Sequence, residues 1–161
     1  MYYIINIGSN LGDRRHNLSR AMAAVMRRYG EIEMSHVVET EPRGYESPNK
    51  FLNVAIMFRS DDQPLDVLAE LQEIERSISD APHRNADGSY ADRILDIDMI
   101  AADDLTMNTE QLTLPHPRLA ERDFFLVPLE EIAPAWRHPL TGLTATEMLS
   151  TLPASKPETP S

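Results

Sequence analysis

The order of strand-like and helix-like patterns is the feature that most constrains the fold of this chain. Apolar and β-branched residues fill four short segments, and two longer segments carry apolar residues at the spacing of an amphipathic helix. In chain order these segments read β-α-β-β-α-β, the split βαβ arrangement. This order predicts an α+β fold with two helices covering one face of a four-stranded antiparallel sheet. The predicted strands are residues 2–7, 31–41, 51–59 and 94–102, and the predicted helices are residues 18–29 and 64–78.

The remaining segments hold residues that interrupt regular structure. Residues 42–50 contain two prolines and a glycine, and residues 80–92 form a second polar loop. Beyond the last strand we expect residues 112–122 to be irregular or a short helix. Residues 124–132 then predict a C-terminal helical extension, which Pro128 is expected to interrupt.

Length and composition limit the classes of protein to which the chain can belong. At 161 residues we expect one domain, residues 1–152, followed by a flexible tail, residues 153–161, without an apolar anchor. The formal net charge of −11 argues against a nucleic-acid partner and against an anionic membrane. No apolar run approaches the roughly 20 residues of a membrane helix. The N-terminus lacks a signal-peptide pattern and cysteine is absent, so we expect a cytoplasmic protein.

Residues 94–102 place two carboxylates inside an otherwise apolar strand. Asp96 and Asp98 are two positions apart and therefore project from the same face, whereas the apolar residues that alternate with them point to the other face. Paired carboxylates are oxygen ligands of the kind that Mg²⁺ takes when it also holds substrate phosphates. An exposed strand face that happens to carry two acids explains the pattern equally well, so both interpretations stay open here.

Phe51 and Asn53 share a face at the start of the third predicted strand. An aromatic ring beside a carboxamide suits a flat heterocycle, because the ring can stack on it and the amide can hydrogen-bond its edge. A core phenylalanine next to an asparagine that caps the loop is the alternative interpretation.

Groups suited to phosphate binding occur in two places. His116, Arg118 and Arg122 lie in a short, proline-stiffened segment, and arginine offers paired donors to phosphate oxygens. The turn from Gly8 to Gly12 follows a strand and precedes a helix, so its N–H groups could face an anion, although it lacks the spacing of a P-loop. Solvated surface arginines and an ordinary strand-to-helix turn are the alternatives.

Seven segments form an ordered set of motifs that runs from about residue 2 to about residue 140. They are Gly8-Ser9-Asn10-Leu11-Gly12, Glu39-Thr40-Glu41-Pro42-x-Gly44, Phe51-Leu52-Asn53, Arg93-x-x-Asp96-Ile97-Asp98, Leu114-Pro115-His116-Pro117-Arg118, Glu121-Arg122-x-Phe124 and Pro128-Leu129-x-Glu131-Ile132-Ala133-Pro134. In order and spacing they resemble the 6-hydroxymethyl-7,8-dihydropterin pyrophosphokinase family. That family has an α+β ferredoxin-like sandwich fold, which agrees with the β-α-β-β-α-β order.

The resemblance implies roles for individual residues. It implies that Asp96 and Asp98 hold two Mg²⁺ ions along the phosphates of ATP. The implied pterin-binding residues are Thr40, Pro42, Arg43, Phe51, Asn53 and Phe124, with the two phenylalanines on either side of the ring. The implied catalytic residues are Arg93, Asp96, Asp98, His116 and Arg122. The implied nucleotide-binding residues are Gln72, Glu75, Arg84, Arg93, His116 and Arg122.

The implied reaction is the transfer of pyrophosphate from ATP to the pterin hydroxymethyl group, with release of AMP, in folate biosynthesis. We expect a monomer whose partners are these two small molecules. Such a transfer needs positioning and charge neutralisation, so no protein nucleophile is required. The chain departs from the family pattern at Asp92, which replaces a proline, and in residues 80–92, where Arg84 is the one arginine. The alternative is therefore a non-catalytic pterin- or nucleotide-binding module of the same fold.

Overall fold

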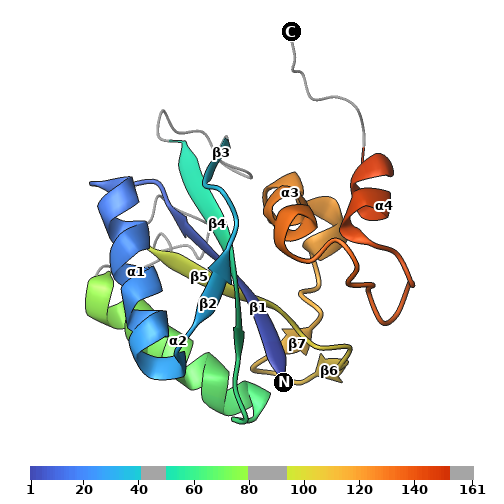
Figure 1. Ribbon diagram of the computed structural model, residues 1–161, viewed down its shortest axis with the longest axis horizontal. Helices are drawn as coiled ribbons and strands as arrows, with labels where there is room; N and C mark the ends of the chain where they lie inside the picture. Colours follow the sequence, from blue (N-terminus) through green and yellow to red (C-terminus); the bar gives the residue numbers. More distant parts are fainter. Residues whose placement is uncertain (41–49, 80–93, 153–161) are drawn as a thin grey trace, which may run out of the picture.

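The main sheet is antiparallel, with strands in the order β2–β4–β1–β5 and with β3 also paired to β4. The computed structural model describes residues 1–40, 50–79 and 94–152 (Figure 1). The strands are β1 Tyr2–Ser9, β2 Ile32–Met34, β3 Val38–Thr40, β4 Phe51–Arg59 and β5 Asp96–Ala102. Helix α1, Arg14–Tyr29, and helix α2, Pro64–Ile78, connect them in the predicted order. The α+β ferredoxin-like prediction is therefore confirmed.

The strand predicted over residues 31–41 is wrong in one respect, because it is divided into β2 and β3. Ser35 lies at the break, where its backbone N–H donates to the Ala55 carbonyl and its hydroxyl accepts from the Ala55 N–H, both at 2.9 Å. Met34 pairs with Ile56 whereas Val38 pairs with Asn53. Between these two pairs the edge segment therefore holds one residue more than β4. This is the geometry of a β-bulge.

Both helices cover one face of the sheet, as predicted, and enclose the larger hydrophobic core. Alternate residues of β1 and β4 point into this core and pack against apolar residues of α1 and α2. Gly30, with φ of 89°, ends α1, and Pro64 begins α2. The buried members include Tyr3, Ile5, Ile7, Val54, Ile56, Phe58, Leu18, Val25, Val67 and Leu71.

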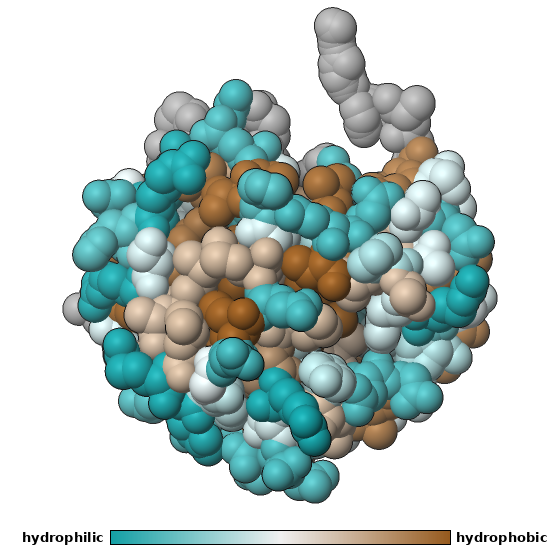
Figure 2. Space-filling model, in the orientation of Figure 1, coloured by the Kyte–Doolittle hydropathy of each residue, from teal (hydrophilic) through white to brown (hydrophobic). Residues whose placement is uncertain are grey.

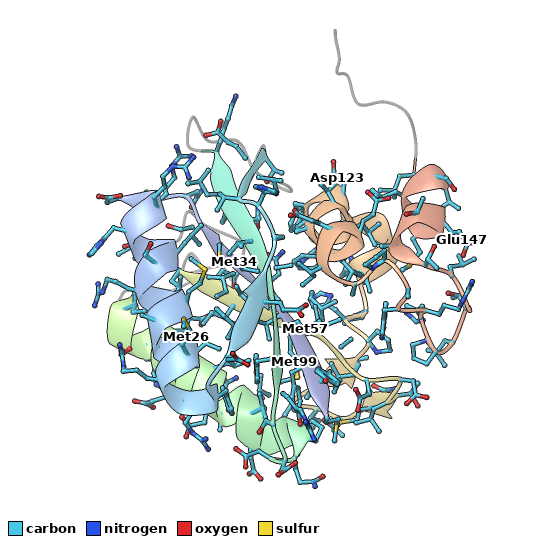
Figure 3. All side chains as sticks on the ribbon, in the orientation of Figure 1. Met26, Met34, Met57, Met99, Asp123 and Glu147 are labelled. Atoms are coloured by element: carbon cyan, nitrogen blue, oxygen red, sulfur yellow. The ribbon has the colours of Figure 1, made fainter. Side chains whose placement is uncertain are left out.

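The C-terminal extension packs against the opposite face, around a second apolar cluster. Helix α3, Asp123–Ile132, and helix α4, Ala145–Ser150, lie on the other side of the sheet from α1 and α2 (Figure 1). Asp123 and Glu147 lie in the first turns of these helices (Figure 3). Pro128 lies inside α3 without ending it, so the predicted interruption is wrong.

Short elements complete the chain between β5 and α3. Strands β6, Met107–Asn108, and β7, Thr113–Leu114, form a small hairpin, and the 3-10 helix η1 spans Leu119–Glu121. Within the three described ranges, no helix is both long and apolar enough to cross a membrane. The predicted tail, residues 153–161, lies outside these ranges, and the single-domain boundary stays a prediction.

The face of the molecule that Figure 2 shows carries a hydrophobic strip. Hydrophobic residues run across its middle, between α1 and α3, with hydrophilic residues around them (Figure 2). Met34 on the edge strand β2 is 49% exposed and lies on this face (Figure 3). The candidate polar residues instead gather on the sheet face towards α3.

Candidate functional site

The two aspartates of β5 lie on the sheet face that α1 and α2 leave free. Leu95 and Met99 are buried in the helix-side core, whereas Asp96 and Asp98 are half-buried and alternate with these residues. Asp96 pairs with Gly8 of β1, and Asp98 pairs with Asn6. The predicted shared face of the two carboxylates is therefore confirmed.

Gly8 lies between an amide group and a carboxylate in one row across the sheet. It pairs with Asn53 on β4 and with Asp96 on β5. A Cβ atom at Gly8 would lie 2.9 Å from the Asn53 Oδ1 atom and 3.5 Å from the Phe51 Cδ1 atom. Any side chain at this position would therefore displace the Asn53 amide, so glycine keeps the space above the centre of the sheet open.

Asn53 is held in a defined orientation beside Phe51. Its side chain is 3% exposed, and its Nδ2 atom donates a hydrogen bond of 2.9 Å to the Thr40 hydroxyl on β3. Thr40 pairs with Phe51 across β3 and β4. Three of the residues assigned to pterin binding by sequence therefore lie together, with the Asn53 Oδ1 atom facing Gly8.

The first turn of α3 brings an aromatic and cationic group to the same side of the sheet. The Phe124 and Phe125 rings meet edge to face at 4.8 Å between centroids. The Arg122 guanidinium carbon lies 5.5 Å from the Phe124 ring centroid and 5.3 Å from that of Phe125. The Asn6 Nδ2 atom donates to the Phe124 carbonyl at 3.3 Å, which places this turn over β1.

His116 lies beside Asp98 at the end of a segment anchored to β5. Its backbone N–H donates to the Ile100 carbonyl at 2.9 Å, and its ring meets Phe125 edge-on at 4.9 Å. The Nδ1 atom accepts a hydrogen bond of 3.1 Å from the Arg118 N–H. The Nε2 atom, 3.8 Å from Asp98 Oδ1, therefore carries the proton of the neutral ring.

The surroundings of His116 disfavour its charged form. Burial, followed by the positive charges of Arg122 and Arg118, lowers the pKa of His116 to about 4. The imidazole is therefore neutral at pH 7, and the contact with Asp98 is not an ion pair. The same positive potential that opposes an imidazolium attracts an anion.

We expect His116 to make the metal-free protein less stable in acid. The pKa lies below the unfolded value of 6.5, so its contribution to stability is complete above pH 6.5 and is lost as the pH falls through 4. Between pH 7.5 and pH 4 the free energy of unfolding should fall by about 3 kcal/mol more in the native protein than in His116→Asn. Urea denaturation at both pH values measures this difference. Asparagine is the matched substitution because its Oδ1 atom can still accept from Arg118, and equal losses in both proteins would contradict the prediction.

The residues assigned to the nucleotide lie partly in the opposite layer. Glu75 on α2 reaches the outer edge of β5, where its Oε2 atom accepts a hydrogen bond of 2.7 Å from the Ile97 N–H, between the two aspartates. Gln72 is exposed on the same helix. The remaining assigned residues, Pro42, Arg43, Arg84 and Arg93, lie outside the described residues.

Two residues of this face were missed by the sequence interpretation. Gly8 was interpreted as part of a turn, because its place between Asn53 and Asp96 depends on strand pairing. Asn6 offered a clearer signal, since it is a buried polar residue between Ile5 and Ile7 in an apolar strand. Buried polar groups need a partner, which points to a specific contact.

The donor set of this face fits a magnesium ion. Among residues 1–40, 50–79 and 94–152, no three histidine or acidic side chains gather to hold a metal ion. Asp96 and Asp98 supply two carboxylates on one face. Mg²⁺ is commonly bound by one or two carboxylates together with water and substrate phosphates, so this set suits it better than a metal held by protein ligands alone.

A family model and individual relatives both match this chain to one family of enzymes. The family model for 7,8-dihydro-6-hydroxymethylpterin-pyrophosphokinase matches residues 4–134. The 2-amino-4-hydroxy-6-hydroxymethyldihydropteridine pyrophosphokinase of Porphyromonas gingivalis is 41% identical over 137 residues, which cover 84% of this chain and 92% of the relative. The enzyme of the same name from Bacillus subtilis is 35% identical over 131 residues, covering 80% of this chain and 75% of the relative.

Solved structures show the same fold. A crystal structure of Plasmodium falciparum HPPK-DHPS superimposes with a TM-score of 0.67 at 14% sequence identity. The match covers 92% of this chain and 44% of the larger one. At this identity the likeness concerns the fold alone.

Proposed function

This chain belongs to the 7,8-dihydro-6-hydroxymethylpterin-pyrophosphokinase family, and from that premise we propose that its two substrates meet on the sheet face between β5 and α3. The enzyme transfers pyrophosphate from ATP to the hydroxymethyl group of 6-hydroxymethyl-7,8-dihydropterin, a step of folate biosynthesis. In this reaction the hydroxymethyl oxygen bonds to the β-phosphorus, the bond from that phosphorus to the α-phosphate oxygen breaks, and AMP leaves.

The pterin half of the proposed site comprises Thr40, Phe51, Asn53 and Phe124. The hydrogen bond from Asn53 to Thr40 supports this assignment, because it fixes an amide beside an aromatic ring. The amide can then hydrogen-bond the edge of the pterin while the rings stack on its faces. Gly8 belongs to the same half, since its missing side chain leaves room beside Asn53.

The phosphate half comprises Asp96, Asp98, His116 and Arg122. We assign two Mg²⁺ ions to the aspartates, and when bound they supply charge neutralisation along the ATP phosphates. Neutral His116 directs its Nε2–H towards Asp98 and can donate to a phosphate oxygen there. Arg122 adds a positive charge and paired N–H donors suited to phosphate oxygens. Arg122 and the assigned Mg²⁺ ions would locally oppose the net charge of −11 of the chain.

The remaining assignments rest on the family resemblance. Gln72 and Glu75 are proposed for the nucleotide side, and the hydrogen bond from Ile97 to Glu75 supports a position near the aspartates. Pro42, Arg43, Arg84 and Arg93 keep their proposed roles at the pterin and the phosphates. A monomeric, cytoplasmic enzyme likewise stays a proposal.

One observation carries the proposed site: Asn53, Gly8 and Asp96 form a single row across β4, β1 and β5. A group that binds the pterin edge and a group that binds the metal are thus separated by one glycine. A pterin bound at Asn53 and phosphates bound at Asp96 would therefore lie side by side on this face.

We expect AMP and pterin pyrophosphate to form in equal amounts from ATP and 6-hydroxymethyl-7,8-dihydropterin in the presence of Mg²⁺. Chromatography of the nucleotides together with phosphorus NMR of the pterin product measures both. Release of ADP would contradict transfer of a pyrophosphoryl group. Binding of the pterin in calorimetry without any nucleotide turnover would instead support the non-catalytic module.

A further inference from the structure

Asn6 is a buried polar residue at the centre of the sheet. It is 2% exposed, and it pairs with Ala55 on one side and with Asp98 on the other. Its neighbours two positions along the strand, Ile4 and Gly8, share its face. Ile4 belongs to the apolar cluster beneath α3, so Asn6 lies between that cluster and the polar half of the site.

The hydrogen bond from Asn6 replaces one that α3 cannot make. In an α-helix the carbonyl of residue 124 would accept from the N–H of residue 128. Residue 128 is Pro128, which has no N–H. The Asn6 Nδ2 atom donates to the Phe124 carbonyl at 3.3 Å and so provides a partner from the sheet.

We infer that Asn6 is a positioning residue that holds the turn carrying Phe124 at a set place above the sheet. This inference rests on the proposed role of Phe124 in stacking on the pterin. Because Asn6 pairs with Asp98, the same residue fixes the distance between that ring and the metal-binding carboxylates. Asn6 therefore sets the pterin in register with the phosphate that it attacks.

Because Pro128 has no N–H, the Phe124 carbonyl depends on the hydrogen bond from Asn6. If Pro128 formed the usual helical bond, the Phe124 carbonyl would be satisfied within α3, and the helix could shift over the sheet without breaking a hydrogen bond. With proline at this position, any shift that separates Phe124 from Asn6 leaves a carbonyl without its partner. An unsatisfied group of this kind costs free energy, so the turn is kept in place.

Asn6→Leu tests the inference, because leucine has a similar size and removes the donor. We expect kcat/KM for the pterin to fall about tenfold, the factor that corresponds to one lost hydrogen bond with its acceptor left unpaired. KM for ATP should change by less than about twofold, since Asp96 and Asp98 lie on β5 and His116 is anchored to that strand rather than to α3. Steady-state kinetics with each substrate varied in turn separates the two effects.

The variant Asn6→Leu/Pro128→Ala separates the tie to the sheet from satisfaction of the Phe124 carbonyl. Alanine at position 128 restores the N–H that donates to this carbonyl within the helix. We expect the double variant to regain the stability that Asn6→Leu loses, because the carbonyl has a partner again. It should keep the roughly tenfold loss in kcat/KM for the pterin, because no side chain then ties the turn to the sheet. Pro128→Ala alone keeps the Asn6 donor and should stay within about threefold of the native enzyme.

Three results would overturn the inference: an unchanged kcat/KM for the pterin in Asn6→Leu, an equal loss towards both substrates, or full recovery of kcat/KM for the pterin in the double variant. If Asn6→Leu does not fold, Asn6→Ser replaces it, because its hydroxyl is too short to reach the Phe124 carbonyl, and the same criteria apply. Phe124→Ala separates this inference from the proposed site. A normal KM for the pterin in Phe124→Ala would reject the stacking role itself, whereas a raised KM with an unaffected Asn6→Leu would reject only the inference.

Discussion

Replacing Asp98 by asparagine should lower turnover by at least about a thousandfold, because neutralisation of phosphate charge by a metal ion is worth several kcal/mol and each 1.36 kcal/mol is a factor of ten. Asp96→Asn should have a similar effect. Asparagine keeps the size of the side chain and removes the anionic oxygen that would bind Mg²⁺. Rates of AMP formation at saturating ATP and pterin, with Mg²⁺ varied, measure the loss.

The folded structure should survive both substitutions. Asp96 and Asp98 are half-buried and belong to neither apolar cluster, so replacing one of them by asparagine leaves the packing of the core intact. Thermal melting should therefore show a cooperative transition without metal, and a smaller increase in midpoint than in the native protein on adding Mg²⁺ with an ATP analogue. Asp104→Asn is the matched control, since Asp104 is an exposed acid just beyond β5. Turnover near the native rate in Asp96→Asn or Asp98→Asn would refute the metal assignment.

The elements that could be predicted are those whose causes lie within the segment itself. Helix α1 ends before a glycine with a positive φ, and α2 begins at a proline, and both signals act on neighbouring residues only. The shared face of Asp96 and Asp98 follows equally from the period of a strand. These predictions needed no knowledge of what packs against the segment.

The errors occurred where a distant residue decides the local structure. The break between β2 and β3 depends on Ser35, which exchanges hydrogen bonds with Ala55 on a neighbouring strand. The continuity of α3 through Pro128 is compatible with the hydrogen bond that Asn6 gives to the Phe124 carbonyl. Neither partner is near in sequence, so local patterns contain no sign of the contact.

In the functional site, too, some features follow from the local sequence and others depend on distant residues. Phe51 and Asn53 could be placed on one face, but the place of Gly8 between Asn53 and Asp96 depends on the registers of two strand pairs. The lowered pKa of His116 also requires the fold, because burial and Arg122 cause it. Residue types therefore predict which chemistry a site can perform, whereas strand register predicts which of the groups meet.

Phe124→Ala should raise KM for 6-hydroxymethyl-7,8-dihydropterin by roughly 10- to 100-fold, since stacking of a heterocycle on an aromatic side chain is worth about 1–3 kcal/mol. The Phe124 ring is half-buried and already contacts Phe125 and the Arg122 guanidinium, so one of its faces is supported by protein. KM for ATP should stay within about twofold, because Phe124 itself does not bind the phosphates and Asp96, Asp98 and His116 do not depend on its ring. Calorimetric titration with pterin and steady-state kinetics together measure both effects.

Phe124→Tyr is the control that separates stacking from helix stability, because it keeps a flat ring in the first turn of α3. The Kd of this variant for the pterin should stay within about threefold of the native value. That is a smaller change than the loss of one hydrogen bond would cause. If both variants weakened binding equally, packing of α3 rather than the ring would be responsible. If neither did, the pterin would have to bind without Phe124, and Phe51 with Asn53 would carry its recognition alone. The single row of Asn53, Gly8 and Asp96 would still align it with the phosphates, so loss of turnover in Asp98→Asn and loss of pterin affinity in Phe124→Ala test independent halves of one site.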